Sequence, residues 1–424
     1  MDNKRIVFIR NYVLAVCFFC AIVHMSIKTK ILYNLADIIE VAFVSGNTVS
    51  ETVEDIGNTE NSGLEEPAKI TLDDITDNIE ELLPYEEKLI NLSGTVMKVA
   101  GVRSYYNEEY GINVTSDGYI INAQNQTSTD YEILQMIHLK QFLDERGVKL
   151  LYVSKPAKYI EDDYYRKEFG GESYLNRNTD LLMERFDDAG IDYVDLRDNL
   201  QKENLNCMDL FYRTDHHWNV PAAKWAAEQV VYKLNESYGY NIDMRLYDDE
   251  NFTYEEFNDC WLGEQGRKIA ESYIGLDDFT LVIPNYETSF TRDLYGEQIT
   301  DNFNLFIDYS TYEDSYSETG EFEPAKLKGW HYSYCGDGYI HNNRADYGNI
   351  LILGDSYERN MIPFLALGVE DICKIEPRYM ESGDVLEMID SGHYDTVIVC
   401  YAQFIIGAHD DPDNANYRAF SFFD

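Results

Sequence analysis

The chain has 424 residues, of which 45% are hydrophobic, so its length and composition predict two or three domains with a full core. Its 77 acidic residues outnumber its 34 basic ones, which gives a net charge of −43. This charge excludes a protein that binds nucleic-acid phosphates, and it disfavours broad contact with an anionic membrane surface.

The first thirty residues combine a basic head with a long apolar run from Tyr12 to Met25, and no small-x-small cleavage site follows. We therefore expect residues 1–30 to form an uncleaved signal anchor, a single transmembrane helix that holds the folded domain on the extracytoplasmic side of the cell membrane. Two alternatives remain. Cleavage of this segment would give a secreted protein, and an N-terminal core helix would leave no anchor.

Residues 31–83 are expected to form an acidic, flexible stalk. Residues 45–70 are rich in Ser, Asn and Gly and contain no aromatic residue, so they cannot bury enough surface to offset the entropy lost on ordering. A single folded domain is then predicted for residues 84–424, with an insert at about 246–347.

Apolar runs alternate with helical patterns in this domain, which predicts an α/β fold of three layers around a parallel sheet, because strands that are apolar throughout are buried on both faces. The insert is rich in Tyr, Phe and Asp and lacks helical periodicity, which predicts irregular or β-rich structure. The expected strands are Lys149–Val153, Ile191–Val194, Asn349–Leu353 and Thr396–Cys400. The expected helices are one that ends near Ala100, one that Asp130 caps and Gly147 closes, and those near 174–189 and 220–237. Residues 112–121 are expected to form a hairpin that turns at Ser116-Asp117-Gly118.

Two segments carry residues suited to acyl chemistry. Gly354-Asp355-Ser356 follows a predicted buried strand, and the carboxyl ends of such strands are where ligands bind in open α/β sheets. A serine hydroxyl becomes a nucleophile when an imidazole takes its proton and a carboxylate orients that imidazole. In an extended Asp215-His216-His217 segment, residues i and i+2 share a face, so Asp215 would orient His217 while His216 points away.

Each segment also has a plainer interpretation. A Gly-Asp-Ser tripeptide is usually only a strand-to-helix turn, and an Asp-His-His run is as often a metal-ligand pair or a surface turn. An anchored metal-binding protein that uses His216 and His217 is therefore a further hypothesis. The other histidines are isolated and the seven cysteines show no zinc spacing, so we expect no metal and no cofactor, with the cysteines buried as small apolar residues.

Thr214-Asp-His-His-Trp218, followed by Gly354-Asp-Ser-Tyr357, resembles the DHHW proteins. These are similar to the SGNH hydrolase-like domain of the AlgX/AlgJ alginate O-acetyltransferases, and the resemblance covers most of residues 84–424. It implies an SGNH-hydrolase-like (flavodoxin-like) fold in which the serine motif follows the Asp/His motif, the reverse of the order in ordinary SGNH esterases. It also implies Ser356 as nucleophile, His217 as base and Asp215 as the partner of that base.

Candidates for substrate or oxyanion contacts lie around these three residues. Trp218 either floors a sugar site or packs the catalytic loop, and Arg378 either contacts substrate or forms an ordinary ion pair. Tyrosines of the insert, among them Tyr309, Tyr312 and Tyr316, either stack on carbohydrate or pack. The full set of candidates is Gly354, Asp355, Tyr357, His216, Trp218, Arg378 and Gln403.

The resemblance implies a membrane-anchored, extracytoplasmic enzyme that acts on O-acetyl groups of a cell-surface polysaccharide, either as an O-acetyltransferase or as an acetylesterase. A transferase would need a multi-pass membrane partner that supplies the acetyl group. The charge of −43 favours a neutral glycan over an acidic one. The alternative is a non-catalytic polysaccharide-binding or assembly protein that keeps the fold.

Overall fold

The computed structural model describes residues 86–106, 111–294, 297–307, 338–381, 383–407 and 415–423. The chain divides into two units, residues 1–102 and 103–424. The described part of the first unit is helix α3 (Glu86–Ala100), which confirms the helix predicted to end near Ala100. The predicted anchor and stalk lie outside the described residues. Within the described ranges, we find no helix whose length and apolar character would let it cross a membrane.

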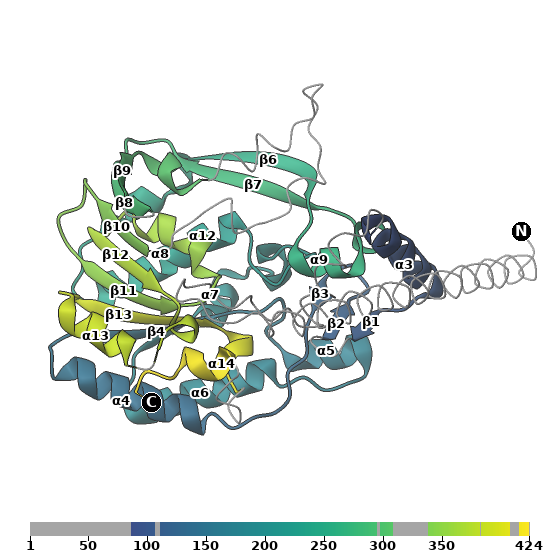
Figure 1. The fold of residues 1–424 in the computed structure, drawn as a ribbon, viewed down its shortest axis with the longest axis horizontal. Helices are drawn as coiled ribbons and strands as arrows, with labels where there is room; N and C mark the ends of the chain where they lie inside the picture. Colours follow the sequence, from purple (N-terminus) through teal and green to yellow (C-terminus); the bar gives the residue numbers. More distant parts are fainter. Residues whose placement is uncertain are drawn as a thin grey trace, which may run out of the picture. The chain divides into compact units, whose positions relative to one another are not determined.

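An eight-stranded sheet forms the centre of the second unit, in the order β5-β4-β13-β11-β12-β10-β8-β9 (Figure 1). The five strands from β5 to β12 are parallel, and the other three are antiparallel. This confirms the predicted α/β class with a mostly parallel sheet. The bounds are β4 Lys149–Lys155, β5 Tyr193–Asp195, β8 Phe290–Leu294, β9 Glu297–Asp301, β10 Gly338–Asn342, β11 Asn349–Gly354, β12 Asp371–Ile375 and β13 Thr396–Ala402.

Helices cover both faces of the sheet, because successive side chains of the central strands are apolar and point to opposite sides. In β11, Ile350 and Ile352 pack into a core with α7, α8 and α12, whereas Leu351 and Leu353 pack into a second core with α4, α6, α13 and α14 (Figure 1). The bounds are α4 Asp130–Asp144, α6 Leu175–Ala189, α7 Leu196–Glu203, α8 Val220–Ser237, α12 Glu358–Leu365, α13 Asp384–Ser391 and α14 Ala415–Ala419.

The predicted hairpin is present. Strands β2 (Gly111–Val114) and β3 (Ile120–Ile121) pair antiparallel, and β1 (Ser104–Tyr106) adds a third strand. The described part of the insert is β-rich, as predicted, but its strands serve two purposes. Strands β6 (Phe252–Trp261) and β7 (Asp277–Pro284) form a separate pair, whereas β8, β9 and β10 extend the main sheet. Two short helices, α9 (Glu264–Ile269) and α10 (Glu271–Ile274), lie between β6 and β7.

Some local predictions were wrong or incomplete. Asp130 is the first residue of α4 rather than its cap, which is Thr129. Helix α5 (Asp162–Phe169), helix α7 and strand β12 were not predicted. The described cysteines have free thiols: Cys207, Cys260 and Cys400 are buried, and Cys373 is partly exposed.

Candidate active site

The segment that carries the Asp-His-His motif is a series of bends between a short 3-10 helix (Cys207–Leu210) and α8. Asp277 of β7 holds its start. One carboxylate oxygen accepts the Arg213 N–H at 3.0 Å, and the other accepts the N–H and the hydroxyl of Thr214 at 2.8 and 2.6 Å. Asn219 holds its end, because its side chain caps α8 by accepting the Ala222 N–H at 3.0 Å. Both ends of the motif are therefore fixed.

Ser356 lies in the turn between β11 and α12, at the carboxyl end of a central parallel strand, and its side chain is partly exposed. Gly354 is required there, since a Cβ at this position would lie 2.4 Å from Oε2 of Glu358. Asp355 fixes the turn. One of its oxygens accepts the Tyr357 N–H at 2.8 Å, and the other accepts the Ala402 N–H of β13 at 2.7 Å.

The structure brings Ser356, His217 and Asp215 together. Nε2 of His217 lies 2.8 Å from Oγ of Ser356, and Nδ1 of His217 lies 2.5 Å from Oδ1 of Asp215. If the Nδ1–H donates to the carboxylate, Nε2 is left to accept the serine proton. This arrangement has the geometry of a nucleophile, a base and an orienting carboxylate.

Burial and charge set the protonation of this group. Burial, together with the neighbouring His216, lowers the pKa of His217 to about 3 against the opposing effect of Asp215, so the imidazole is neutral at pH 7. Burial would raise the pKa of Asp215, but His216, His217 and the hydrogen bonds from His217 outweigh it and hold that pKa far below its usual range. A neutral imidazole beside an ionised carboxylate is the state that a general base needs.

The second oxygen of Asp215 is held by the insert. Oδ2 accepts the Glu264 N–H at 2.7 Å, and the neighbouring Gly263 N–H donates to Oγ1 of Thr214 at 2.8 Å. A Cβ on Gly263 would lie 2.4 Å from Cβ of Asp215. No role was predicted for Gly263, Glu264 or Asp277, all of which lie in the insert.

A buried ionic cluster lies beneath the serine turn. Nζ of Lys155, from the end of β4, donates to Asp355 at 2.8 Å, to the Cys400 carbonyl at 3.2 Å and to Glu358. Burial and the charge of Asp355 raise the pKa of Glu358 to about 7 despite Lys155. Burial alone would raise the pKa of Asp355, but the effect of Lys155 is larger and lowers that pKa below its usual value. Lys155 and Asp355 therefore form the ion pair, and Glu358 is the extra carboxyl group, the one for which this cluster of described residues holds no second cation.

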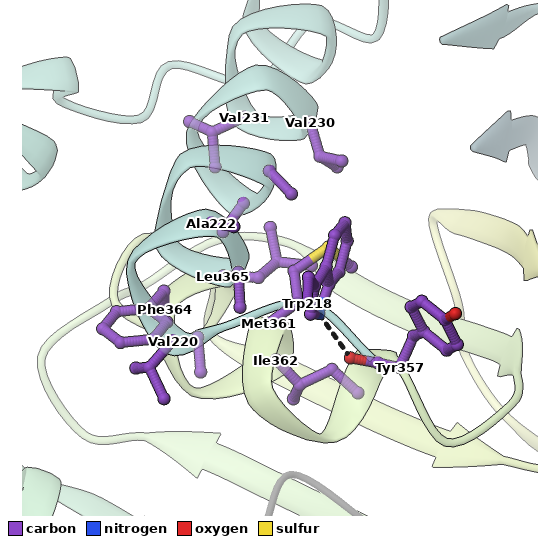
Figure 2. Packing of buried hydrophobic residues seen from close by; sticks show 14 of the residues in the cluster. Trp218, Val220, Ala222, Val230, Val231, Tyr357, Met361, Ile362, Phe364 and Leu365 are labelled. Carbon is purple, nitrogen blue, oxygen red and sulfur yellow. Dashed lines mark hydrogen bonds between the residues drawn. The ribbon is translucent and has the colours of Figure 1, made fainter. Parts of the chain in front are cut away.

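Trp218 and Tyr357 tie the two segments together. The Trp218 side chain is fully buried, and its indole N–H donates to the Tyr357 carbonyl at 3.1 Å (Figure 2). The Tyr357 hydroxyl donates to the His216 carbonyl. Trp218 therefore packs the motif against α8 and α12 and does not floor a sugar site.

The remaining candidates separate into those that reach the site and those that do not. His216 was predicted to point away, but its ring lies 3.8 Å from that of His217, because the segment bends and is not extended. Gln403 is not an oxyanion donor: its amide nitrogen donates to Asn176 and Thr179, and its oxygen accepts the Ala157 N–H. Arg378 forms the ordinary ion pair with Glu376, at 2.9 Å.

A pocket of about 380 Å³ opens beside the motif. His216 and Tyr357 border it, and most of its other walls are apolar or carry amides, among them Ile121, Asn122, Pro156 and Phe404. Such a mixture of apolar walls and a few polar groups is typical of a small-molecule site. The tyrosines proposed as a stacking platform, Tyr309, Tyr312 and Tyr316, lie outside the described residues.

Metal-ligating atoms also meet at the motif. Side-chain atoms of Asp215, His216 and His217 lie within 4.8 Å of one another. Both ring nitrogens of His217 already have partners, Asp215 and Ser356, so a metal ion there would displace one of these hydrogen bonds. The geometry fits acyl chemistry without such a rearrangement.

Comparisons with known proteins support the same fold. Residues 115–253, which include the Asp-His-His motif, match the family model described as an SGNH hydrolase-like domain, acetyltransferase AlgX. No curated protein sequence matches the chain. The structure of Bacillus cereus PatB1 with a sulfonyl adduct is similar, with a TM-score of 0.57 and 17% identity over 74% of this chain and 98% of that one. A DHHW family protein from Eubacterium siraeum DSM 15702 gives a TM-score of 0.50 and 16% identity over 76% of this chain and 99% of that one. These matches confirm the resemblance to DHHW and AlgX-type proteins and the SGNH-like fold.

Proposed function

We propose that this protein is a serine acyl-enzyme that transfers or removes O-acetyl groups on a cell-surface polysaccharide. The observation that carries the proposal is the hydrogen-bonded series from Asp215 through His217 to Ser356, at 2.5 and 2.8 Å. The match of residues 115–253 to an acetyltransferase domain supports the choice of an acetyl group.

The reaction has two steps. Oγ of Ser356 attacks the carbonyl carbon of an acetyl ester while Nε2 of His217 takes the hydroxyl proton, and the ester C–O bond then breaks as His217 returns that proton to the leaving alcohol. In the second step, His217 takes a proton from a sugar hydroxyl or from water. The resulting oxygen nucleophile attacks the carbonyl carbon of the acetyl-serine, the bond between that carbon and Oγ breaks, and His217 returns its proton to Oγ, which releases the acetylated sugar or acetate and restores the free Ser356.

The turn also offers a donor for the oxyanion of each step. The N–H groups of Asp355 and Tyr357 are bonded within the turn, whereas that of Ser356 has no partner within the described part of the chain. A single N–H that is already in place when charge develops on the carbonyl oxygen stabilises the transition state.

The polymer, the location and the partner follow from the resemblance and from residues 1–30. We place the enzyme on the extracytoplasmic face of the cell membrane, anchored by residues 1–30, with a multi-pass membrane protein as the source of the acetyl group. The net charge of −43 repels acidic polymers at long range and favours a neutral glycan.

The test uses the full-length protein with p-nitrophenyl acetate as donor. We expect steady release of p-nitrophenol and an intact mass increased by one acetyl group, both lost in Ser356→Ala. The matched control is Ser391→Ala, a serine at the end of α13 that is far from the motif in sequence and exposed. It should keep both signals.

Transfer is distinguished from hydrolysis by adding short neutral oligosaccharides as acceptors and measuring acetylated products by mass spectrometry. A folded wild-type protein that shows neither turnover nor an adduct, with or without acceptor, would reject the acyl-enzyme. The remaining explanation would then be a polysaccharide-binding protein that retains the fold.

A further inference from the structure

A second pocket, of about 550 Å³, adjoins the first one. The two pockets share Lys158 and Tyr159, both of which are buried, so these side chains form the wall where the pockets meet. The first pocket also contains His216 and Tyr357 from the motif, whereas the second contains neither. Both volumes fall within the range of about 300–1,000 Å³ that is usual for ligand sites.

The second pocket combines aromatic rings with exposed carboxylates. Tyr159 and Tyr164 stack with their ring centroids 6.0 Å apart, and Tyr119 contributes a third, partly exposed ring. The carboxylates at its rim are those of Asp117, Glu161 and Asp209, all exposed. Aromatic faces pack on the C–H faces of sugar rings, and carboxylates accept hydrogen bonds from sugar hydroxyls.

Lys158 is the feature that points to a ligand. Its side chain is 95% buried, and Nζ donates to two backbone carbonyls, those of Ile120 at 2.7 Å and Arg213 at 3.1 Å. An ammonium group has three N–H donors, and the described residues offer no carboxylate within ion-pair distance of Lys158. The Tyr119 ring, whose centroid lies 5.9 Å from Nζ, is a weaker cation–π neighbour, and the described residues give Nζ no third oxygen acceptor. The third donor is therefore available to an oxygen atom of a molecule in the adjoining pockets.

We propose that the second pocket is a distal subsite for an uncharged sugar unit of the glycan whose neighbouring unit occupies the first pocket. This rests on the proposed function, in which the acetyl group is exchanged at Ser356, beside the first pocket that His216 and Tyr357 border. Lys158 donates its third N–H to a glycan oxygen between the two units, and Tyr119 packs on the distal ring. The three rim carboxylates repel a uronate, which sets the charge class of the polymer.

The electrostatics around Lys158 agree with an uncharged ligand. Burial, with a smaller effect of Arg213, lowers the pKa of Lys158 to about 7 against the opposing effect of Asp277 and Asp215. At neutral pH, the amine is therefore only partly protonated in the empty pocket. A sugar hydroxyl bonds to either form, because it accepts the third N–H of the ammonium group or donates its own O–H to the lone pair of the neutral amine, so binding does not require an anion.

The experiment measures oligosaccharide binding by isothermal titration calorimetry on full-length Ser356→Ala, which prevents turnover. The probes are cellohexaose, cellotriose, N-acetyl-chitohexaose, N-acetyl-chitotriose and a mannuronate hexamer. At least one neutral hexamer should bind about tenfold more tightly than its own trimer, and the uronate hexamer should bind more weakly than that neutral hexamer. Adding Tyr119→Ala should abolish the advantage of the hexamer, whereas Tyr232→Ala, an exposed tyrosine of α8 outside both pockets, should keep it.

A second variant guards against misfolding of Tyr119→Ala. Glu161→Gln with Asp209→Asn changes two exposed carboxylates and should raise the affinity for the uronate hexamer relative to neutral hexamers. Binding that is independent of chain length, that is unchanged by Tyr119→Ala, or that is tightest for the uronate overturns the subsite, as does a lack of binding by every neutral probe. Length-dependent binding without an acetyl adduct in the wild type would instead reject the acyl chemistry and leave the subsite standing.

Discussion

Glu358 gives the sharpest test of the buried cluster beneath the serine turn. Burial, then the charge of Asp355, raises its pKa from 4.5 to about 7, and at about 1.4 kcal/mol per pH unit this shift corresponds to roughly 3 kcal/mol of unfolding free energy. Because the folded-state pKa lies above the unfolded one, this stability is present in full below pH 4.5 and is lost as the pH rises through 7. Lys155 and Lys374 oppose the shift but do not cancel it.

Glu358→Gln removes the titration and keeps the shape. Its two carboxylate oxygens accept from Lys155 and from the Asp355 N–H, and an amide can replace only one of them, which costs about 1–2 kcal/mol. We therefore expect the variant to be less stable than the wild type at pH 5, and the difference to move by roughly 3 kcal/mol in its favour by pH 8.5.

Urea unfolding of the full-length protein, followed by tryptophan fluorescence at several pH values, measures this difference. Glu236→Gln, an exposed glutamate on α8, is the matched control and should change stability by no more than about 0.5 kcal/mol. A difference between Glu358→Gln and the wild type that stays constant from pH 5 to pH 8.5 would refute the assignment of Glu358 as the extra carboxyl group.

Three further predictions concern the motif. Asp215→Asn should lower kcat for p-nitrophenyl acetate by about 10³–10⁴-fold while circular dichroism stays that of the wild type, because an amide stabilises neither the required tautomer nor the imidazolium. Gly263→Ala should lower kcat by about 100-fold, because its Cβ would displace Asp215, whereas Gly171→Ala, where a Cβ meets only ordinary contacts, should leave kcat unchanged. With the pKa of His217 lowered to about 3, the base is already deprotonated at pH 5; kcat/KM should therefore show no loss with an apparent pKa near 6.5, and such a loss would contradict the assignment.

The central strands could be predicted because their apolar runs are local in sequence. Strands β4, β11 and β13 were all found from such runs, and each begins at its predicted residue. Strand β12 was missed because polar Asp371 and Lys374 interrupt its pattern, and the buried Lys374 pairs with Glu376 at 2.6 Å. That contact makes a polar side chain compatible with a buried strand, and a pattern of apolar residues does not reveal it.

The three residues of the motif could also be predicted, since each lies in a short, chemically distinctive segment. Their supports could not. Asp277 and Gly263 lie 62 and 48 residues beyond Asp215 in an insert that sequence patterns leave featureless. Gln403 shows the opposite error: its place after β13 suggested an oxyanion donor, but side chains of α6 occupy its amide nitrogen. Whether a polar group is free to act depends on partners that are distant in sequence.

The arrangement of supports has a consequence for how the site is assembled. The sheet holds the nucleophile, since Lys155 reaches from the end of β4 across the Cys400 carbonyl of β13 to Asp355 beside Ser356. The insert holds the base, through Asp277 and the Glu264 N–H.

Three contacts join the Asp-His-His segment to the serine turn. One is the 2.8 Å contact between His217 and Ser356; the others are the hydrogen bonds from Trp218 to the Tyr357 carbonyl and from the Tyr357 hydroxyl to the His216 carbonyl. A change in β7 or α9 can therefore separate base from nucleophile while the sheet and the serine turn stay intact.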